Sequence, residues 1–461
     1  MKQKEEAKSI EELKHQSRRY SIAEGMCASA KTYMGDNYVQ PFAIALNASN
    51  PVVALLNSAS GLLWPISQIY GSKLMEKYSR KKISLVIAFL RSLFWISLII
   101  LAILFYRNFH TAIIPALLLI FYGIYNILAG IAHPSWFSWI GDLVNEKYGG
   151  KWFSKRELFI GTSGAIALLI SAVFLDLFKK PESLILGFAV LFFAAFLLRL
   201  GSSYFLSKQY EPKLKLSKKY YFSFWQFLKK APKTNFGKFA IFRAMIAFSI
   251  SISSSLLTVY LLRDLNLGYL NYTLIVFGAG FVSFFVLEFW GKFADKYGNY
   301  RVIAITTLTI PIVPILWVLN SSPIYLFFVP SLLSHLSWVG FNLATNNFIY
   351  DNVHIQKRGI AVSYYNILWG AGVFCGSGIA AILIKYLSFS LVNSIFLIFV
   401  ISALVAMIAT FYWIPKLKEI RKTEKLKGIK SVEKLIIQDG KSTIKEEFHQ
   451  LMSIGRYFHI R

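Results

Sequence analysis

Charged side chains stand inside long apolar stretches of this 461-residue chain. Glu24, Lys31 and Asp36 fall in the first stretch, and Arg243 falls in a later one. An ionisable group in such a place is costly unless it is paired or hydrated, so each is a candidate for function. The chemistry open to them is ion pairing, solute binding and proton transfer. Asp36 is the best proton-carrier candidate, because burial favours the neutral form of a carboxyl group.

The spacing of the polar residues predicts shared helix faces. Three pairs are seven residues apart: Glu24 and Lys31, Asn126 and His133, and His335 and Asn342. Seven residues are about two helical turns, so we expect each pair to face one polar space. Other interpretations remain open. Glu24 and Arg243 would also fit snorkelling to a membrane surface or pairing with each other. His133 and Asn342 would also fit satisfied hydrogen bonds between helices.

Composition indicates that the elements carrying these residues cross a membrane. Hydrophobic residues make up 56% of the chain and charged residues 16%, whereas soluble domains carry about 25% charged residues. Spanning helices need about 20 apolar residues, and helices satisfy their backbone groups in lipid. We predict twelve spans, at 20–47, 52–71, 83–106, 111–137, 157–176, 182–206, 239–262, 268–291, 301–319, 323–348, 359–385 and 389–414.

The net charge of +27 is placed asymmetrically. If the N-terminus is inside, most of the 50 lysines and arginines fall in the termini and the even-numbered loops. This pattern predicts a multi-pass protein of the cell membrane with both termini cytoplasmic. No nucleic-acid-binding motif accompanies the charge, so we expect no nucleic-acid partner. Residues 1–19 lack the apolar core of a signal peptide, and the two cysteines predict no disulfide framework.

A short charged segment occurs twice. Residues 291–301 read Gly-Lys-Phe-Ala-Asp-Lys-Tyr-Gly-Asn-Tyr-Arg, and a degraded copy at 72–82 precedes it by 219 residues. Asp142 and Asp351 close the fourth and tenth spans in similar fashion. The repeat predicts two parallel halves of six helices each. The expected organisation is an N-terminal segment 1–19, a bundle 20–206, a basic linker 207–238, a bundle 239–414 and a basic tail 415–461. The linker fits either a helix at the membrane surface or a solvated strand of chain.

With this hairpin in both halves, the chain resembles the major facilitator superfamily, whose hairpin reads G-x-x-x-D-[RK]-x-G-[RK]-x-[RK]. The second copy keeps Gly291, Asp295, Lys296, Gly298 and Arg301, and has Asn299 where a basic residue is usual. The first copy keeps Lys77, Arg80 and Lys82, but has Ser72, Glu76 and Ser79 at the other positions. The resemblance implies an all-α membrane fold of twelve helices in two pseudo-symmetric six-helix bundles.

The resemblance also implies a cytoplasmic gate and a central cavity. Spans 1, 4, 7 and 10 would line the cavity, and they hold the polar residues named above. The implied gate residues are Glu76, Arg80, Asp142, Arg156, Asp295, Arg301, Asp351 and Arg358. Glu76 would meet Lys357 and Arg358, and Asp295 would meet Lys155 and Arg156. Arg80 and Arg301 would bring in the two aspartates that close the spans. The alternative is that these charges only set the topology.

We predict secondary transport of a small solute by alternating access, coupled to protons, by a monomer in the lipid bilayer. The sequence has no phosphate-binding loop and no cluster of metal ligands, so no enzyme activity and no cofactor are expected. Lys31, His133, Arg243 and His335 would suit an organic anion. Two alternatives stay open: an exporter of lipid-like or drug-like amphiphiles, and a non-transporting receptor or scaffold on the same fold.

Overall fold

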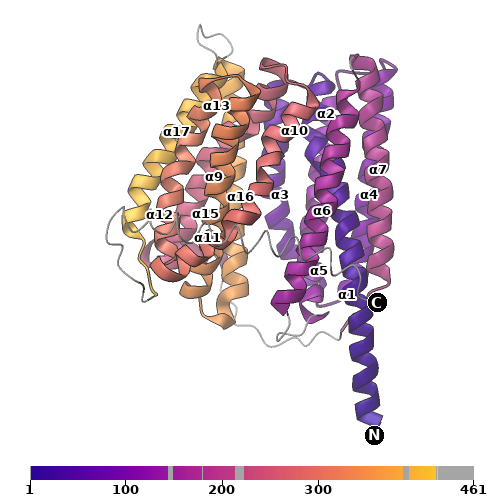
Figure 1. The fold of residues 1–461 in the computed structure, drawn as a ribbon, viewed down its shortest axis with the longest axis vertical. Helices are drawn as coiled ribbons and strands as arrows, with labels where there is room; N and C mark the ends of the chain where they lie inside the picture. Colours follow the sequence, from indigo (N-terminus) through magenta and orange to yellow (C-terminus); the bar gives the residue numbers. More distant parts are fainter. Residues whose placement is uncertain are drawn as a thin grey trace. The chain divides into compact units, whose positions relative to one another are not determined.

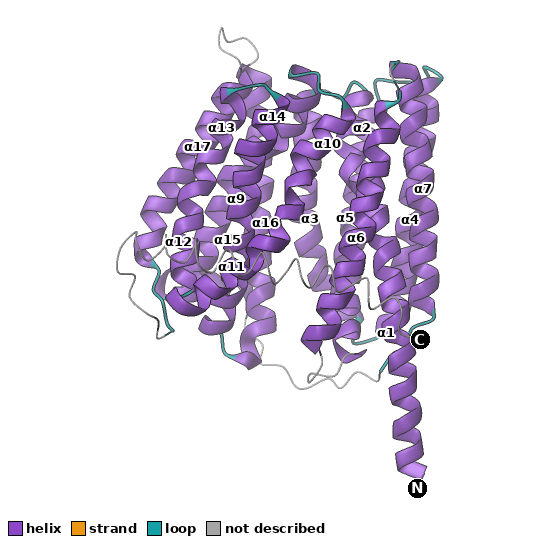
Figure 2. Cartoon of the chain, viewed as in Figure 1, coloured by secondary structure: helices purple, strands orange, loops and turns teal. Residues whose placement is uncertain are grey.

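The computed structural model describes residues 2–143, 149–178, 180–212, 223–387, 394–421 and 423. All regular structure in these residues is helical (Figure 2). The helices of the first sequence half are α1 Lys2–Met34, α2 Val39–Ala45, α3 Asn50–Leu74, α4 Arg80–Tyr106, α5 Ile114–Leu143, α6 Gly149–Asp176 and α7 Pro181–Ser207. Those that follow are α8 Phe224–Lys230, α9 Asn235–Val259, α10 Tyr269–Phe277, α11 Val282–Tyr297, α12 Asn299–Thr309, α13 Val313–Leu319, α14 Pro323–Leu326, α15 Leu332–Asn352, α16 Ile355–Tyr386 and α17 Ser394–Trp413.

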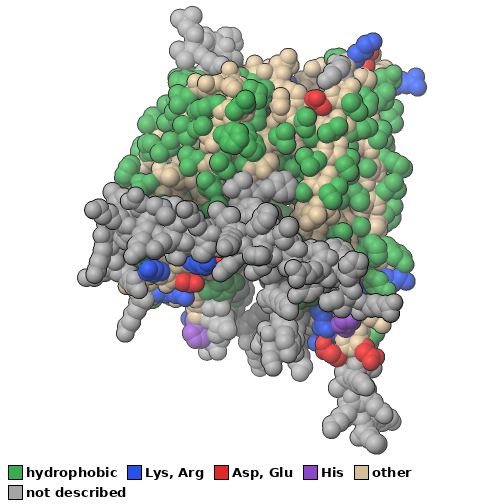
Figure 3. Space-filling model, in the orientation of Figure 1, with side chains coloured by type: hydrophobic (Ala, Val, Ile, Leu, Met, Phe, Trp, Pro, Cys, Tyr) green, Lys and Arg blue, Asp and Glu red, His purple; other side chains and the backbone are tan. Residues whose placement is uncertain are grey.

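Ten helical segments in the described part of the chain are long and apolar enough to cross a membrane. The other two predicted spans are interrupted helices. A 3₁₀ turn at Asp36–Tyr38 separates α1 from α2, and another at Gly278–Phe281 separates α10 from α11. Figure 3 shows many hydrophobic side chains on the upper part of the face in view. The protein is therefore an all-α, multi-pass membrane protein, and the count of twelve spans stays a prediction.

The chain divides into two compact units that do not coincide with the two sequence halves. Unit 1 comprises Met1–Lys218, Ser251–Thr273 and Trp369–Ile395. Within it, α3 packs against α5, α4 against α5 and α7, and α1 against α6 and α7 (Figure 1). Unit 2 comprises Lys219–Ile250, Leu274–Leu368 and Phe396–Arg461. There α15 packs against α11 and α12. The division proposed from the sequence stays a prediction.

Part of the predicted linker is helical. Ser223 and Gln226 form a capping box at the start of α8, so two backbone N–H groups that the helix leaves free are satisfied. Phe227 is buried against Tyr364, with ring centroids 5.7 Å apart, whereas Trp225 is exposed. The end of the linker therefore packs on unit 2. Residues 213–222 and most of the tail lie outside the described residues.

Candidate functional site

The first span breaks at Gly35, beside the best proton-carrier candidate. A Cβ atom at Gly35 would overlap the ring of Trp95, so only glycine fits between the ring and the chain. Helix α1 ends at Met34, and the 3₁₀ turn begins at Asp36. Irregular backbone at membrane depth is tolerated only where protein or water surrounds it. The break therefore places Asp36 at an irregular point of the span.

The break brings three polar side chains together. The Lys31 Nζ lies 2.5 Å from Asp36 Oδ2 and 3.1 Å from the hydroxyl oxygen of Tyr125. The Tyr125 hydroxyl donates to Asp36 Oδ1 at 2.8 Å. The Lys31 side chain is 5% exposed and that of Asp36 is 22% exposed. Two residues of the predicted cavity thus form a nearly buried ion pair that Tyr125 of α5 clamps.

Helices α4 and α7 add two arginines to this cluster. The Arg91 guanidinium lies 4.3 Å from the ring centroid of Tyr125, which also stacks on Phe94 at 4.3 Å. Arg199 is buried and close enough for its charge to interact with those of Arg91 and Asp36. Neither arginine is among the cavity residues predicted from the sequence. The feature that could have identified them is their charge within the apolar third and sixth spans.

Glu24 takes part in a second network in unit 1. Its Oε2 lies 3.6 Å from Arg156 Nη2, and Ser202 donates to its Oε1 at 3.1 Å. Arg156 also donates to the Ser21 hydroxyl at 3.2 Å. Glu24 and Arg156 are 4% exposed each. The structure therefore joins a predicted cavity residue to a predicted gate residue of the same unit.

Among the described residues of unit 1, Asn126 and His133 contact none of the other predicted site residues. Asn126 donates to the carbonyl of Tyr122 in its own helix at 2.7 Å. The ring of His133 lies edge-on to Trp64 and stacks on Phe137, with centroid separations of 5.0 and 6.0 Å. These contacts are those of packed side chains within unit 1.

In unit 2, Arg243 and Asn342 come together as two predicted cavity residues. Arg243 donates to Asn342 Oδ1 at 3.3 Å and to the Tyr365 hydroxyl at 3.1 Å. Its guanidinium also lies 5.1 Å from the ring centroid of Trp338. Arg243 is 7% exposed. The Arg243 guanidinium in the second sequence half thus lies among mostly aromatic side chains.

His335 lies one turn of helix away from Ser331. Its Nδ1 is 2.9 Å from the Ser331 carbonyl oxygen, and a Cβ on Gly280 would lie 3.6 Å from its ring. Within the described residues, no group of three or more His, Cys, Asp or Glu side chains could hold a metal ion.

The predicted pairing of Arg80 with Asp142 is present in unit 1. Arg80 Nη1 lies 2.6 Å from Asp142 Oδ2, and the Arg80 backbone N–H donates to Glu211 Oε1 at 2.7 Å. The guanidinium also donates to the carbonyls of Ser138 and Pro212. Arg80 is 1% exposed. The charged segment therefore ties the start of α4 to the end of α5 and to the chain after α7.

Unit 2 repeats this arrangement with a hydrogen bond from an amide in place of the ion pair. Asn299 donates to Asp351 Oδ2 at 2.8 Å, and the Tyr300 N–H donates to Glu419 Oε2 at 2.9 Å. Asn299 stands 219 residues after Arg80, so it is the matching position of the repeat. An amide replaces a guanidinium, and the tie between the third and fourth helices of the half loses its ion pair.

The remaining predicted gate residues meet local partners. Asp295 and Asp351 both lie near Arg421, at 3.7 and 3.6 Å. Arg301 donates to the carbonyl of Tyr297 at 2.9 Å, and Glu76 is exposed. The side chains of Lys155 and Arg358 lie outside the described set. The predicted pairings of Glu76 and of Asp295 across the halves stay predictions.

Residues of both sequence halves meet inside unit 1, and we call these contacts the seal. They are hydrogen bonds of Tyr38 with Thr273, Gln40 with Thr258, Asn57 with Ser377, Ser58 with the carbonyl of Phe374, and Arg263 with Asn50 and the carbonyl of Ala48. A Cβ at Gly370 would overlap the Gly61 carbonyl oxygen, so α3 and α16 approach closely. The loop at 46–49 is predicted to be external, so the seal would lie toward that side.

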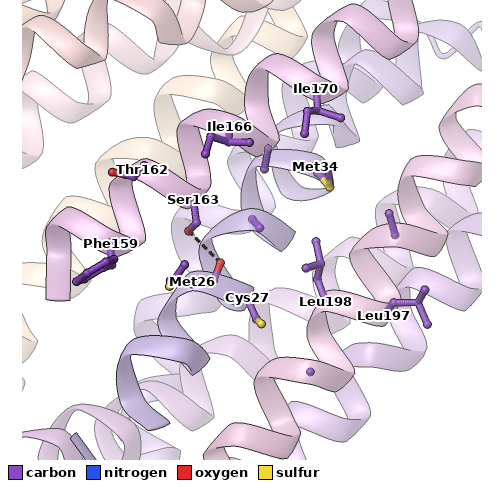
Figure 4. A pocket seen from close by; sticks show the side chains of 14 residues that line it. Met26, Cys27, Met34, Phe159, Thr162, Ser163, Ile166, Ile170, Leu197 and Leu198 are labelled. Carbon is purple, nitrogen blue, oxygen red and sulfur yellow. Dashed lines mark hydrogen bonds between the residues drawn. The ribbon is translucent and has the colours of Figure 1, made fainter. Parts of the chain in front are cut away.

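An apolar groove runs between α1, α6 and α7 of unit 1 (Figure 4). Its volume is about 630 Å³. Cys27, Met34, Ile166 and Leu198 are among the lining residues, and the Ser163 hydroxyl donates to the Met26 carbonyl at 3.2 Å. Such a surface suits a hydrocarbon chain more than a polar solute.

The family of the chain follows from a direct comparison. The model of the Major Facilitator Superfamily matches residues 25–287 and 239–451, so the chain belongs to that superfamily. Membership makes it a membrane transporter of a small solute rather than an enzyme. No curated protein matches the chain in sequence.

Solved structures share the fold. The nucleoside transporter NupG has a TM-score of 0.61 at 14% identity, covering 88% of this chain and 100% of its own. A bacterial homologue of the iron transporter ferroportin, in an inward-facing state, has a TM-score of 0.60 at 13% identity, covering 86% and 98%. The POT family transporter PepTSo has a TM-score of 0.59 at 12% identity, covering 86% and 97%. At sequence identities this low, the structural similarity shows a shared fold and does not indicate a shared substrate.

Proposed function

We propose that the protein is a proton-coupled secondary transporter of a small organic anion in the cell membrane. The observation that carries the proposal is the Lys31–Asp36 ion pair at the break of the first span. Broken helices at membrane depth are where transporters of this general plan build ion and substrate sites. A nearly buried ion pair can exchange its internal partner for an external one, because either charge alone is costly there.

The proposed coupling uses the two members of this pair differently. Lys31 would bind the anionic group of the solute, and Asp36, released from Lys31, would take up a proton. Tyr125 contacts both side chains and would keep the free carboxyl oriented. The solute and the proton would then cross together, because each neutralises one charge of the separated pair.

Two further observations support this proposal. Arg243 gives the second sequence half a buried cation of its own. The seal closes unit 1 toward the predicted external side, and alternating access requires such contacts to break in each cycle.

A flux experiment tests the proposal. Purified protein is reconstituted in vesicles that hold a pH-sensitive dye, and a panel of organic acids is added outside. The proposal predicts a pH change inside for at least one acid, beyond that in protein-free vesicles, and its loss in Asp36→Asn. A panel that produces no protein-dependent pH change or tracer uptake would leave the receptor or scaffold alternative.

The groove favours one second candidate, transport of an amphiphile. A lipid-like molecule could place its chain between α1, α6 and α7, where Cys27 lines the wall. Labelling of Cys27 by a thiol reagent would then slow in the presence of long-chain amphiphiles. An unchanged labelling rate of Cys27, with Cys375 as the internal control, would contradict this candidate.

A further inference from the structure

Two basic side chains contact Tyr125 in unit 1, and a third interacts with it through its charge. Lys31 lies 3.1 Å from its hydroxyl, the Arg91 guanidinium lies over its ring, and the Arg199 charge interacts with the same residues. Lys31 forms an ion pair with Asp36. Within the described part of the chain, Arg91 and Arg199 form no ion pair. The cluster thus holds more positive than negative charge.

Glu24 offsets this excess only in part, because its ion pair is with Arg156. Its carboxylate is shared between Arg156, at 3.6 Å, and the hydroxyl of Ser202, at 3.1 Å. Ser202 in turn accepts from Arg199 Nη1 at 3.3 Å. Arg199 forms no ion pair with Glu24 and meets it through this hydroxyl group, although the two charges interact. Among the described residues Arg91 forms no ion pair, and its charge interacts with that of Asp36 at longer range.

The same cluster holds three buried donors without acceptors. Among the described residues, Arg91 Nε, Arg199 Nε and Trp95 Nε1 have no hydrogen-bond partner. Arg199 is 9% exposed and Trp95 is fully buried. Buried donors are normally satisfied, and each such exception calls for a physical explanation. Uncompensated positive charge and unpartnered donors together are the features that an anion would complete.

We infer that Lys31, Arg91, Arg199 and the Trp95 indole form a binding site for one small anionic group, of carboxylate or halide size. The partly exposed Asp36 side chain marks the side from which the group would enter. Arginine suits this task, since its planar group binds anions through several donors at once. The inference deepens the proposed function, on which its role in transport rests, by assigning the anion to this cluster.

Anion binding to purified full-length protein in detergent tests the site. Melting temperature is measured in sodium gluconate while chloride or acetate replaces gluconate at constant ionic strength and pH. Chloride represents a free inorganic anion, and acetate represents the carboxylate of an organic solute. The site predicts a saturable rise in melting temperature with at least one of them, because ligands stabilise the state that binds them.

Variants separate the site from a general salt effect. Arg91→Gln and Arg199→Gln each remove a charge, and the apparent affinity should fall about tenfold or more. Arg107→Gln, an exposed arginine at the end of α4, should bind as wild type. Arg91→Lys keeps the charge and should bind with intermediate affinity. A cooperative melting transition in gluconate shows for each variant that it is folded. No saturable rise with either salt, or a rise unchanged in Arg91→Gln, would overturn the site.

The outcome is separable from that of the transport proposal. Saturable binding lost in the arginine variants, without solute flux in vesicles, leaves the site standing and contradicts transport. Flux without any saturable anion effect leaves transport standing and contradicts the site.

Discussion

The Lys31 ammonium and the Asp36 carboxylate lie 2.5 Å apart although they are five positions apart in sequence. Residues with this spacing point away from each other on a continuous α-helix. The 3₁₀ turn after Gly35 brings the carboxylate back toward Lys31. The contact therefore depends on the break in the span.

Asp36→Asn should separate coupling from binding. The amide can still accept from Lys31 but cannot exchange a proton, so uptake driven by a pH gradient should be lost while exchange of labelled for unlabelled solute continues. Both are measured in the same vesicles. Glu182→Gln, an exposed carboxylate in the first turn of α7, is the matched control. Full gradient-driven uptake by Asp36→Asn would refute the proton role of Asp36.

Tyr125→Phe should weaken both stability and coupling. The change removes the hydroxyl that contacts Lys31 and Asp36 but keeps the ring that stacks on Phe94. Losing a hydrogen bond to charged groups costs about 1.5–3 kcal/mol. A lower melting temperature is expected relative to wild type, with no comparable loss in Tyr106→Phe, where the tyrosine is exposed. Equal melting temperatures for the two variants would argue against the clamp.

Sequence predicted this site only in part. Lys31 and Asp36 could be chosen because charge is rare in an apolar stretch. Their direct pairing could not be predicted, since periodicity assumes an unbroken helix. Arg91 and Arg199 lie in the third and sixth spans, outside the four spans that the resemblance places at the cavity. Packing nevertheless brings Arg91 onto the Tyr125 ring, and the charge of Arg199 interacts with the same residue. The apolar helices can thus be predicted from composition. The contacts between polar groups cannot, because they depend on local breaks in the helices and on tertiary packing.

The two glycines of the second hairpin should respond oppositely to alanine. Gly298 has φ = +95° and its added Cβ would overlap the Glu419 side chain, so Gly298→Ala should destabilise the protein by about 1–3 kcal/mol. A Cβ on Gly291 would meet no atom within 4 Å, so Gly291→Ala, inside α11, should be neutral or stabilising by about 0.5–1 kcal/mol. Melting temperatures in one detergent compare the two. The account fails here if Gly291→Ala is the more damaging change.

Charge reversal should not rescue the tie at Arg80. Arg80→Gln removes the ion pair to Asp142 and should lower stability by up to about 3 kcal/mol, less than for a fully buried pair because Asp142 is half-exposed. The double variant Arg80→Asp with Asp142→Arg restores opposite charges but leaves the Ser138 and Pro212 carbonyls without their donor. It should melt no higher than Arg80→Gln. Recovery to the wild-type melting temperature would show that charge alone matters.

The internal repeat could be predicted from the sequence. The matching contacts of its two copies can be identified only when the copies are aligned with an offset of 219 residues. The alignment that pairs Glu76 with Asp295 also pairs Arg80 with Asn299. Asn299 then makes the contact to Asp351 that the repeat requires. The acids after the last helix of each half, Glu211 and Glu419, were not predicted. Glu211 accepts from a backbone N–H group at the start of α4, and Glu419 accepts from one at the start of α12. Contacts of this kind leave no periodic pattern in the sequence from which to predict them.

Cross-linking the seal tests alternating access most directly. Asn57 Nδ2 donates to Ser377 Oγ at 2.9 Å, so cysteines at these positions can be joined by a short bifunctional thiol reagent with a reducible spacer. The background carries Cys27→Ser and Cys375→Ser, since both native cysteines are free. The account predicts that flux stops when Asn57→Cys and Ser377→Cys are joined and returns on reduction, with each single cysteine variant unaffected. Wild-type flux through fully cross-linked protein would contradict it.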